Sequence, residues 1–302
     1  MKIVGAGISG LIGASLSRAL LEKYEVVRLK RAGAIHERPF GFSREAVWDP
    51  SRGGDWVKEL DGAYGVVNLC GEPIAAKRWT AKQKERIRES RLLTTKAIVD
   101  AIGEAAVKPK VLVNASAVGF YGPRGEGETL NEDAPAGSGF LADVCKEWEN
   151  QAQRARSFGT RVVLLRTGIV LSREGGALSK LLPPFRFFLG GPLGSGKQTV
   201  SWVHLQDEVR AILKVLEDPA VEGPVNVAAP HPVSMRELAE TMGRVLHRPS
   251  FFSVPGFVLR TLLGEMAEML LEGQKAYPRK LAAAGFQFKF ETLETALRDL
   301  LK

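Results

Sequence analysis

The sequence predicts an α/β fold: a doubly wound parallel sheet followed by a smaller C-terminal α/β lobe. Three observations lead to this prediction. Short and almost entirely apolar runs alternate with longer helical patterns through about residue 170, which is typical of strands buried on both faces of a parallel sheet. A glycine-rich turn joins the first apolar run to the first helical pattern. Glycine and proline become frequent after residue 171, where regular alternation stops.

Six strands are predicted in the first part from their apolar composition and length. They lie at Lys2–Gly5, Glu25–Leu29, Ala46–Trp48, Gly65–Cys70, Lys110–Ala115 and Arg161–Arg166. Helices are expected between them, and one begins at Thr80, where Gln83 three residues later completes a capping box. Another is expected from about Leu141 to Ser157, because apolar residues recur there at helical spacing.

A second part of the chain is expected after residue 171. Residues 172–196 are rich in Gly and Pro and are predicted to form loops that cross a cleft. Ser234 and Glu237 form another capping box, for a helix through about Leu246. The predicted elements that follow are an apolar helix near Phe257–Leu271, a strand near Phe286–Phe290 and a closing helix.

Composition narrows the class of protein. The chain has 302 residues, of which 45% are hydrophobic, so a large core can be buried. Cys70 and Cys145 are the two cysteines and form no C-x-x-C pair, so neither a disulfide framework nor a metal site is expected, and a reducing cytoplasm fits. We expect no signal peptide and no membrane span, because no apolar stretch reaches about 18 residues.

The formal net charge of +8 is spread along the chain. Lys and Arg often stand beside acids, and aromatic and basic residues are not interleaved, so nucleic-acid binding is not favoured. We interpret the charge as a solvated surface with some basic residues available for phosphates.

The glycine-rich opening carries the first functional prediction. Gly5, Gly7 and Gly10 form G-x-G-x-x-G, and Gly7, Gly10 and Gly13 form G-x-x-G-x-x-G. In a strand–turn–helix context such glycines let a pyrophosphate approach backbone N–H groups at the start of a helix, where the partial charge is positive. The alternative is a glycine-rich turn that binds nothing. The context favours a Rossmann-type dinucleotide site.

The end of the second strand indicates which dinucleotide is bound. It reads Arg28-Leu29-Lys30-Arg31, where NAD-specific sites usually carry an acid for the ribose hydroxyls. A guanidinium can hold a 2′-phosphate through two hydrogen bonds, so Arg31 favours NADP(H). The alternative is a pair of solvated charges. We therefore expect an NADP-binding domain over residues 1–171, to which later segments return, and a substrate lobe over residues 172–302.

Longer motifs make the chain similar to a known family. They include Gly7-Ile-Ser-Gly10-Leu-Ile-Gly13, Val67-Asn68-Leu69-Cys70-Gly71-Glu72-Pro73-Ile74, Lys77-Arg78-Trp79, Glu89-Ser90-Arg91, Ser116-Ala117-Val118-Gly119-Phe120-Tyr121-Gly122, Leu165-Arg166-Thr167-Gly168-Ile169-Val170-Leu171 and Trp202-Val203-His204. Over almost its full length the sequence resembles the extended short-chain dehydrogenases/reductases. More narrowly it resembles the epimerase family proteins described as nucleoside-diphosphate-sugar epimerases, the group containing atypical extended member 39U.

The resemblance implies a set of cofactor contacts and a C-terminal module often labelled DUF1731, here at about residues 248–301. The implied contacts are Gly7, Ser9, Gly10, Leu11, Ile12, Gly13, Arg31, Leu69, Cys70, Gly71, Glu72, Arg91, Gly168, Ile169 and Val170.

The resemblance also implies a Ser, a Tyr and a Lys as catalytic residues, the last two as Y-x-x-x-K on one helix. Ser116 matches the serine and Lys146 the lysine, but the tyrosine position holds Ala142, which carries no proton to exchange. Tyr121 is the nearest replacement in sequence, and the alternative for it is a packed aromatic side chain. Lys146 could instead bond the nicotinamide ribose, or be an exposed helix lysine.

Substrate contacts are expected where the fourth strand ends. Arg78 could hold a phosphate or carboxylate, and Trp79 could offer a stacking face, the alternative being a surface loop with one buried aromatic. His204 is a further candidate, for which a structural role is the alternative.

Two functions follow from these residues. The first is an NADP-dependent epimerase or oxidoreductase that acts on a small, phosphorylated or nucleotide-linked substrate. The second is a non-catalytic NADP(H)-sensing protein, which the Ala142 departure favours and which fits the label "cell-division inhibitor" carried by some relatives. The sequence leaves the oligomeric state open.

Overall fold

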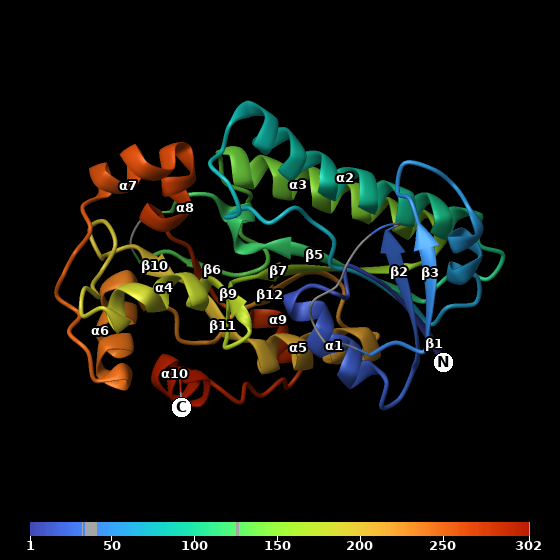
Figure 1. Ribbon diagram of the computed structural model, residues 1–302. Coiled ribbons are helices and arrows are strands. Elements are labelled where there is room, and N and C mark those ends of the chain that lie inside the picture. The colour runs from blue at the N-terminus through green and yellow to red at the C-terminus, as the bar shows by residue number, and fades with distance from the viewer. Residues whose placement is uncertain (32, 34–40, 125–126, 302) are drawn as a thin grey trace.

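A computed structural model describes residues 1–31, 33, 41–124 and 127–301 of the chain. A seven-stranded parallel sheet forms its centre, in the order β12-β7-β5-β4-β1-β2-β3 (Figure 1). The strands are β1 (Lys2–Ala6), β2 (Glu25–Arg31), β3 (Arg44–Trp48), β4 (Gly65–Asn68), β5 (Val111–Ala117), β7 (Arg161–Thr167) and β12 (Gly223–Val227). The predicted fold class is therefore confirmed, and all six predicted strands are present.

Helices cover both faces of this sheet. One face carries α1 (Leu11–Leu20) and α5 (Leu205–Glu217), and the other carries α2 (Ala81–Glu104) and α3 (Phe140–Gln153) (Figure 1). Successive residues of β1 point to opposite faces, so Ile3 packs in one core with Leu16, and Val4 in the other with Ile98. Burial on both faces explains why the central strands are continuous apolar runs.

The edge strand β12 comes from late in the chain. It pairs in parallel with β7, with Asn226 opposite Arg166. Its residues are Gly-Pro-Val-Asn-Val, too short and too polar to stand out as a buried strand in the sequence. A segment beyond residue 172 therefore lies in the same sheet as the first six strands.

The second part contains more regular structure than its composition predicted. Residues 172–196 were expected to be loops, but they include a helix, α4 (Ala177–Arg186), with Pro183 and Pro184 inside it. Leu178 and Phe185 of α4 are buried in a core that also holds Trp202. This apolar face stabilises the helix despite the backbone N–H groups that the prolines lack.

The described residues also form three small sheets and two further helices. They are β8 (Ile169–Ser172) with β9 (Gly175–Gly176) and β11 (Trp202–His204), β10 (Thr199–Val200) with β13 (Val233–Ser234), β6 (Thr129–Leu130) with β14 (Lys275–Ala276), α6 (Met235–Leu246) and α9 (Arg279–Ala283). The predicted caps are present: Thr80 accepts from the backbone N–H of Gln83, and Ser234 from that of Glu237.

Two predictions near the C-terminus are wrong. The apolar segment Phe257–Leu271 is not one helix but α7 (Gly256–Leu263), a 3-10 turn η4 (Gly264–Ala267) and α8 (Glu268–Leu271). The break falls at Gly264, whose φ of +62° ends α7. Residues 286–290 do not form a strand and lead instead into α10 (Leu293–Leu301).

The reason for the missing strand is a side chain. The backbone N–H groups of Lys289 and Phe290 each donate a 2.8 Å hydrogen bond to the carboxylate of Asp207, at the start of α5. Asp207 is fully buried and takes the place of a neighbouring strand. Within the described residues, no helix is long and apolar enough to span a membrane.

Candidate functional site

The turn between β1 and α1 is built around glycines. Gly7 has φ +75°, and a Cβ there would lie 2.6 Å from the carbonyl carbon of Leu69. A Cβ on Gly13 would lie 2.3 Å from Cα of Ile8. Both positions therefore require glycine, one for backbone conformation and both for close packing.

Gly10 differs, because it faces open space. It is exposed, it is the N-cap of α1 without a side-chain cap, and a Cβ would meet only the Gly7 carbonyl oxygen, at 3.3 Å. The first turn of α1 contains no acidic residue. Its N–H groups thus present uncompensated positive partial charge at the carboxyl edge of the sheet, which is where an anion such as a pyrophosphate fits.

The basic residues of β2 have different partners. Arg28 is buried and pairs with Glu45 at 2.9 Å, and Lys30 pairs with the same carboxylate at 3.3 Å. Arg31 is exposed at the end of the strand and has no ion pair among the described residues. Its charge opposes the effect of burial, which raises the pKa of the Cys70 thiol to about 12. Arg31 therefore places an exposed positive charge near Cys70.

Helix α2 contributes Arg91 to the same edge. Its Nη1 donates to the carbonyl oxygens of Ile87 and Glu72, at 2.8 and 3.2 Å, and a Cβ on Gly71 would lie 3.1 Å from the guanidinium carbon. Burial lowers the pKa of Arg91. The structure thus brings Arg91 against the strand-end residues with which the sequence grouped it.

Four more of the predicted cofactor residues pack against one core. Leu11, Ile12, Leu69 and Val170 are partly buried against the cluster that contains Ile3 and Leu16. The backbone N–H of Gly168 donates to the carbonyl oxygen of Val227, and β8 begins at the next residue. Val170 packs against the same core as Leu11, the first residue of α1, whereas Ile169 packs against the core that contains Trp202.

Ser116 lies near the end of β5 and is almost fully buried. Its hydroxyl donates a 2.7 Å hydrogen bond to Oε1 of Glu149 on α3. Arg166 of β7 binds both oxygens of the same carboxylate, through Nε and Nη2, each at 2.9 Å. The serine that matches the family is therefore held by a buried acid whose charge is balanced by a buried guanidinium.

The lysine and the alanine of the expected helical pair lie on α3. Ala142 is buried, and Lys146 forms a 2.6 Å ion pair with Asp143 one turn earlier on the helix. The ammonium of Lys146 is about two-fifths exposed. Its position permits both interpretations given above, cofactor binding and an exposed helix lysine.

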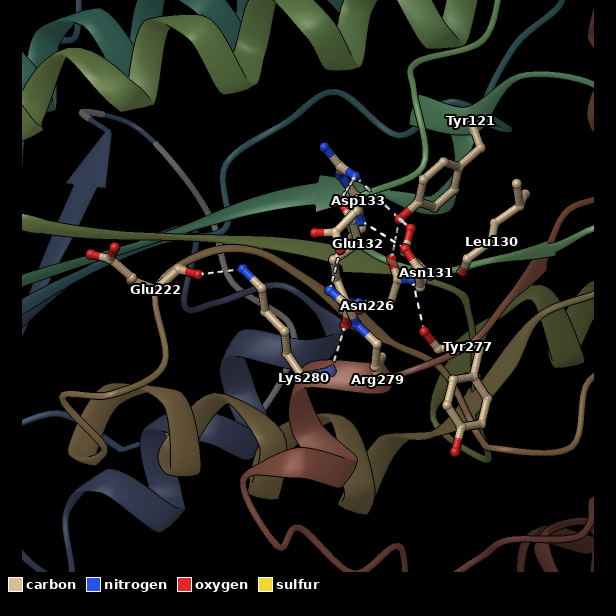
Figure 2. Close-up of polar contacts among 11 residues, drawn as sticks. Tyr121, Leu130, Asn131, Glu132, Asp133, Glu222, Asn226, Tyr277, Arg279 and Lys280 are labelled. Atoms are coloured by element: carbon tan, nitrogen blue, oxygen red, sulfur yellow. Dashed lines mark hydrogen bonds and ion pairs between the residues drawn. The ribbon is translucent and has the colours of Figure 1, made fainter.

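Tyr121 closes the 3-10 turn η2 (Val118–Tyr121) and is fully buried. Its hydroxyl lies 2.6 Å from Oδ1 of Asn226 and 3.0 Å from the carbonyl oxygen of Asn131, and it accepts from Nη1 of Arg166 at 3.1 Å (Figure 2). Burial raises the pKa of Tyr121. These contacts favour the packed aromatic side chain over a proton donor.

The three predicted substrate residues are not brought together. Trp79 is buried, donates from Nε1 to the carbonyl oxygen of Ile74 at 2.8 Å, and packs edge-on against Phe140, so it offers no open face. Arg78 is exposed and lines a basic hollow of about 310 Å³ with Lys77, Lys82 and Arg86.

His204 lies in the interior as the N-cap of α5. Its Nδ1 accepts from the backbone N–H of Gln206 at 3.0 Å, and its ring stacks on Phe290 with centroids 3.8 Å apart. Burial lowers the pKa of His204. These contacts correspond to the structural alternative for this residue.

Several residues that shape the site gave little signal in the sequence. Glu149 lies in α3, Arg166 in β7 and Asn226 in β12, and their neighbours in these elements do not mark them as site residues. One available signal is that Glu149 falls at the helical spacing of Ala142, Cys145 and Ala152, an acid within an apolar face. In the described part of the chain, no cluster of three or more His, Cys, Asp or Glu side chains could hold a metal ion.

Comparison with known sequences identifies two family models that match the chain. Residues 3–228 match the NAD dependent epimerase/dehydratase family, and residues 254–300 match a domain of unknown function, DUF1731. The chain is 40% identical over 308 residues to "Epimerase family protein SDR39U1 homolog, chloroplastic" of Arabidopsis thaliana, covering 100% of this chain and 87% of that protein. It is 35% identical over 302 residues to "Epimerase family protein YfhF" of Bacillus subtilis, covering 100% and 98%.

Solved structures of epimerase family proteins also superpose on this chain. A crystal structure of human epimerase family protein SDR39U1 with NADPH superposes with a TM-score of 0.87 at 34% identity, covering 99% of each chain. A nucleoside-diphosphate sugar epimerase from Corynebacterium glutamicum superposes with a TM-score of 0.77 at 30% identity, covering 99% of this chain and 58% of that one. Given the glycine turn, the Rossmann-type sheet and these matches, the chain belongs to the NAD dependent epimerase/dehydratase family, and within it resembles the SDR39U1-like epimerase family proteins.

Proposed function

We propose that the protein binds NADP(H) and uses it in an oxidoreductase or epimerase reaction on a small, phosphorylated or nucleotide-linked substrate. The observation that carries the proposal is the pairing of uncapped N–H groups at the start of α1 with the exposed Arg31 at the end of β2. The NADPH in the human relative's crystal structure and the name of the Corynebacterium relative support the cofactor and the substrate class.

The chain's own residues fit this cofactor. The turn Gly7–Gly10 and the first turn of α1 would hold the pyrophosphate, and Arg31 the 2′-phosphate. Arg91 would face the ribose and pyrophosphate from α2, and Gly168–Val170 would run beside the nicotinamide. When bound, the nicotinamide supplies hydride transfer. We also propose a cytoplasmic location, because Cys70 and Cys145 are free thiols.

Calorimetry tests the cofactor assignment. We expect NADPH to bind more tightly than NADH, and Arg31→Ala to reduce this preference at least tenfold, because two charge-assisted hydrogen bonds are lost. Lys23→Ala is the matched control, since it removes one cation that pairs with Glu217 away from the site. A preference for NADH, or equal affinities in wild type and Arg31→Ala, contradicts the assignment.

A non-catalytic NADP(H) sensor is the second candidate, and Ala142 at the tyrosine position favours it. The two functions differ in turnover. Incubation of NADPH and carbonyl compounds with the protein, followed by nicotinamide absorbance, supports catalysis where turnover occurs and Ser116→Ala abolishes it. Tight NADPH binding without turnover across broad panels supports sensing.

A further inference from the structure

The site lacks the tyrosine that would exchange a proton with the substrate, and the other candidates are engaged elsewhere. The hydroxyl of Tyr121 is bonded to Asn226 and Arg166, and the ammonium of Lys146 is paired with Asp143. Cys145 adjoins Ser116, but burial, helped by the charge of Glu149, raises the pKa of its thiol to about 11, so it stays neutral near pH 7. Glu149 is thus the acid–base group in direct contact with Ser116.

The direction of the hydrogen bond between Ser116 and Glu149 follows from chemistry. Arg166 donates to both oxygens of Glu149, so both carboxyl oxygens act as acceptors in this contact. The hydroxyl proton of Ser116 therefore points at Oε1 of Glu149, 2.7 Å away. What the serine can offer a bound molecule is a lone pair, so it favours a group that donates a hydrogen bond.

We propose that Glu149, acting through Ser116, is the proton acceptor of this site, and that the group that docks at Ser116 is a substrate hydroxyl. The proposal rests on the proposed function and deepens it, because it names the residue that takes the proton in place of the missing tyrosine. Ser116 is the residue that touches the substrate, and Glu149 positions it and takes its proton.

Each proton and electron pair has a destination. As the alcohol is oxidised, its O–H bond breaks and the proton passes to Oγ of Ser116, while the Ser116 proton passes to Oε1 of Glu149. The carbon–hydrogen bond breaks with its electron pair, which leaves as hydride to the oxidised nicotinamide dinucleotide. Reduction of the carbonyl reverses every transfer, and Glu149 returns the proton through Ser116.

The fold supports this relay from α3 and β7. Glu149 lies seven residues after Ala142, two helical turns further along the same face of α3, and contacts Ser116 from there. Its partner Arg166 lies 3.4 Å from the ring centroid of Phe120 and donates to the carbonyl oxygen of Glu132. Arg166 is the charged group that contacts Glu149 among the described residues, and the Cys145 thiol lies close enough for the charges of Glu149 and Arg91 to affect its pKa.

A network behind Arg166 fixes its position. Asn226 bonds the hydroxyl of Tyr121, and its Nδ2 donates to the carbonyl oxygens of Leu130 and Tyr277 (Figure 2). Glu132 accepts from the backbone N–H groups of Asn226 and Lys280, both at 3.1 Å. The segment Tyr277–Lys280 belongs to the DUF1731 region, so this region helps to hold the guanidinium that balances Glu149.

The experiment uses UDP-glucose and its 2-, 3- and 4-deoxyfluoro derivatives as probes, bound to the NADP⁺-loaded protein and measured by calorimetry. Fluorine cannot donate a hydrogen bond, so at one ring position the substitution should weaken binding about tenfold. Glu149→Gln should abolish this penalty, because the amide can donate to Ser116 and turn the serine proton outward. Glu147→Gln, on the outer face of α3 with Arg88, is the control and should keep the penalty.

Ser116→Ala keeps the Glu149–Arg166 pair and should also lose the penalty, so the test stands if Glu149→Gln does not fold.

A second readout needs no substrate: in a Cys70→Ser background, Glu149→Gln should make Cys145 react with iodoacetamide at lower pH, since a negative neighbour is removed. The proposal is overturned if no fluorine substitution weakens binding, or if UDP-glucose does not bind. It is also overturned if Ser116→Ala shows the same loss of affinity as wild type, or if Glu149→Gln leaves the pH dependence of the Cys145 reaction unchanged. Failure of the wild type to bind NADPH overturns the proposed function instead.

Discussion

The hydroxyl of Thr167 donates a 2.9 Å hydrogen bond to Oε1 of Glu208, at the point where β7 leads into the Gly168–Val170 segment. Glu208 lies on α5 and is 1% exposed, and its other carboxyl oxygen has no hydrogen-bond partner within the described residues. Burial raises the pKa of Glu208 to about 8, against the single opposing hydrogen bond from Thr167. The carboxyl group beside the Gly168–Val170 segment is thus neutral at pH 7.

This pKa predicts a stability that depends on pH. The folded state keeps the Glu208 proton up to about pH 8, while the unfolded chain releases it near pH 4.5, so the free energy of unfolding falls as pH rises between these values. Between pH 6 and 9 the loss should be about 2–3 kcal/mol. Urea unfolding at both values should show this loss in wild type and not in Glu208→Gln. An equal loss in both proteins contradicts the prediction, and Glu237→Gln, at an exposed acid, is the control.

A second prediction concerns the buried pair of Arg166 and Glu149, which are 3% and 5% exposed. Arg166→Met should lower the free energy of unfolding by about 3–5 kcal/mol, because it leaves the carboxylate buried without its partner. Adding Glu149→Gln should recover part of this loss, since the uncompensated charge is removed. A double-mutant cycle by urea unfolding measures the coupling, and additive losses would show that the pair is not coupled.

Glycine has two different roles in the turn between β1 and α1, and substitutions at Gly7 and Gly10 can separate them. Gly7→Ala should lower both stability and NADPH affinity, because φ is +75° and the new Cβ would press on Leu69. Gly10→Ala should leave the midpoint of thermal unfolding within about 2 °C of wild type, but reduce NADPH affinity at least tenfold, since its methyl group would cover the N–H groups of α1. Unchanged affinity in Gly10→Ala would place the anion elsewhere.

Asp207 should be important for stability although it lies away from the site. It is fully buried and accepts from the backbone N–H groups of Lys289 and Phe290. Asp207→Ala leaves both groups without a partner and should cost about 2–4 kcal/mol in urea unfolding. Asp55→Ala, at an aspartate whose side chain is 94% exposed, is the control and should have a much smaller effect. A small effect at Asp207 would mean that water replaces the carboxylate.

The sequence by itself determined the features that depend on local periodicity and backbone chemistry. The strand at Lys2–Gly5, the turn at Gly7 and the cap at Thr80 could be predicted because each depends on residues within a few positions of one another. The basic end of β2 could be predicted for the same reason. Two of the wrong predictions, the strand at Phe286–Phe290 and the continuous helix at Phe257–Leu271, came from apolar patterns that cannot show which partner will satisfy the backbone.

Only the tertiary structure decided which side chains meet. Ser116 and Glu149 are 33 residues apart, and Tyr121 and Asn226 are 105 apart, so no local pattern reports these hydrogen bonds. The interior also decided protonation, because the pKa of Glu208 rises with burial that composition does not reveal. The sequence fixes each residue's chemistry and local conformation, whereas the packing of distant segments sets the partners and the water exclusion that turn this chemistry into a site.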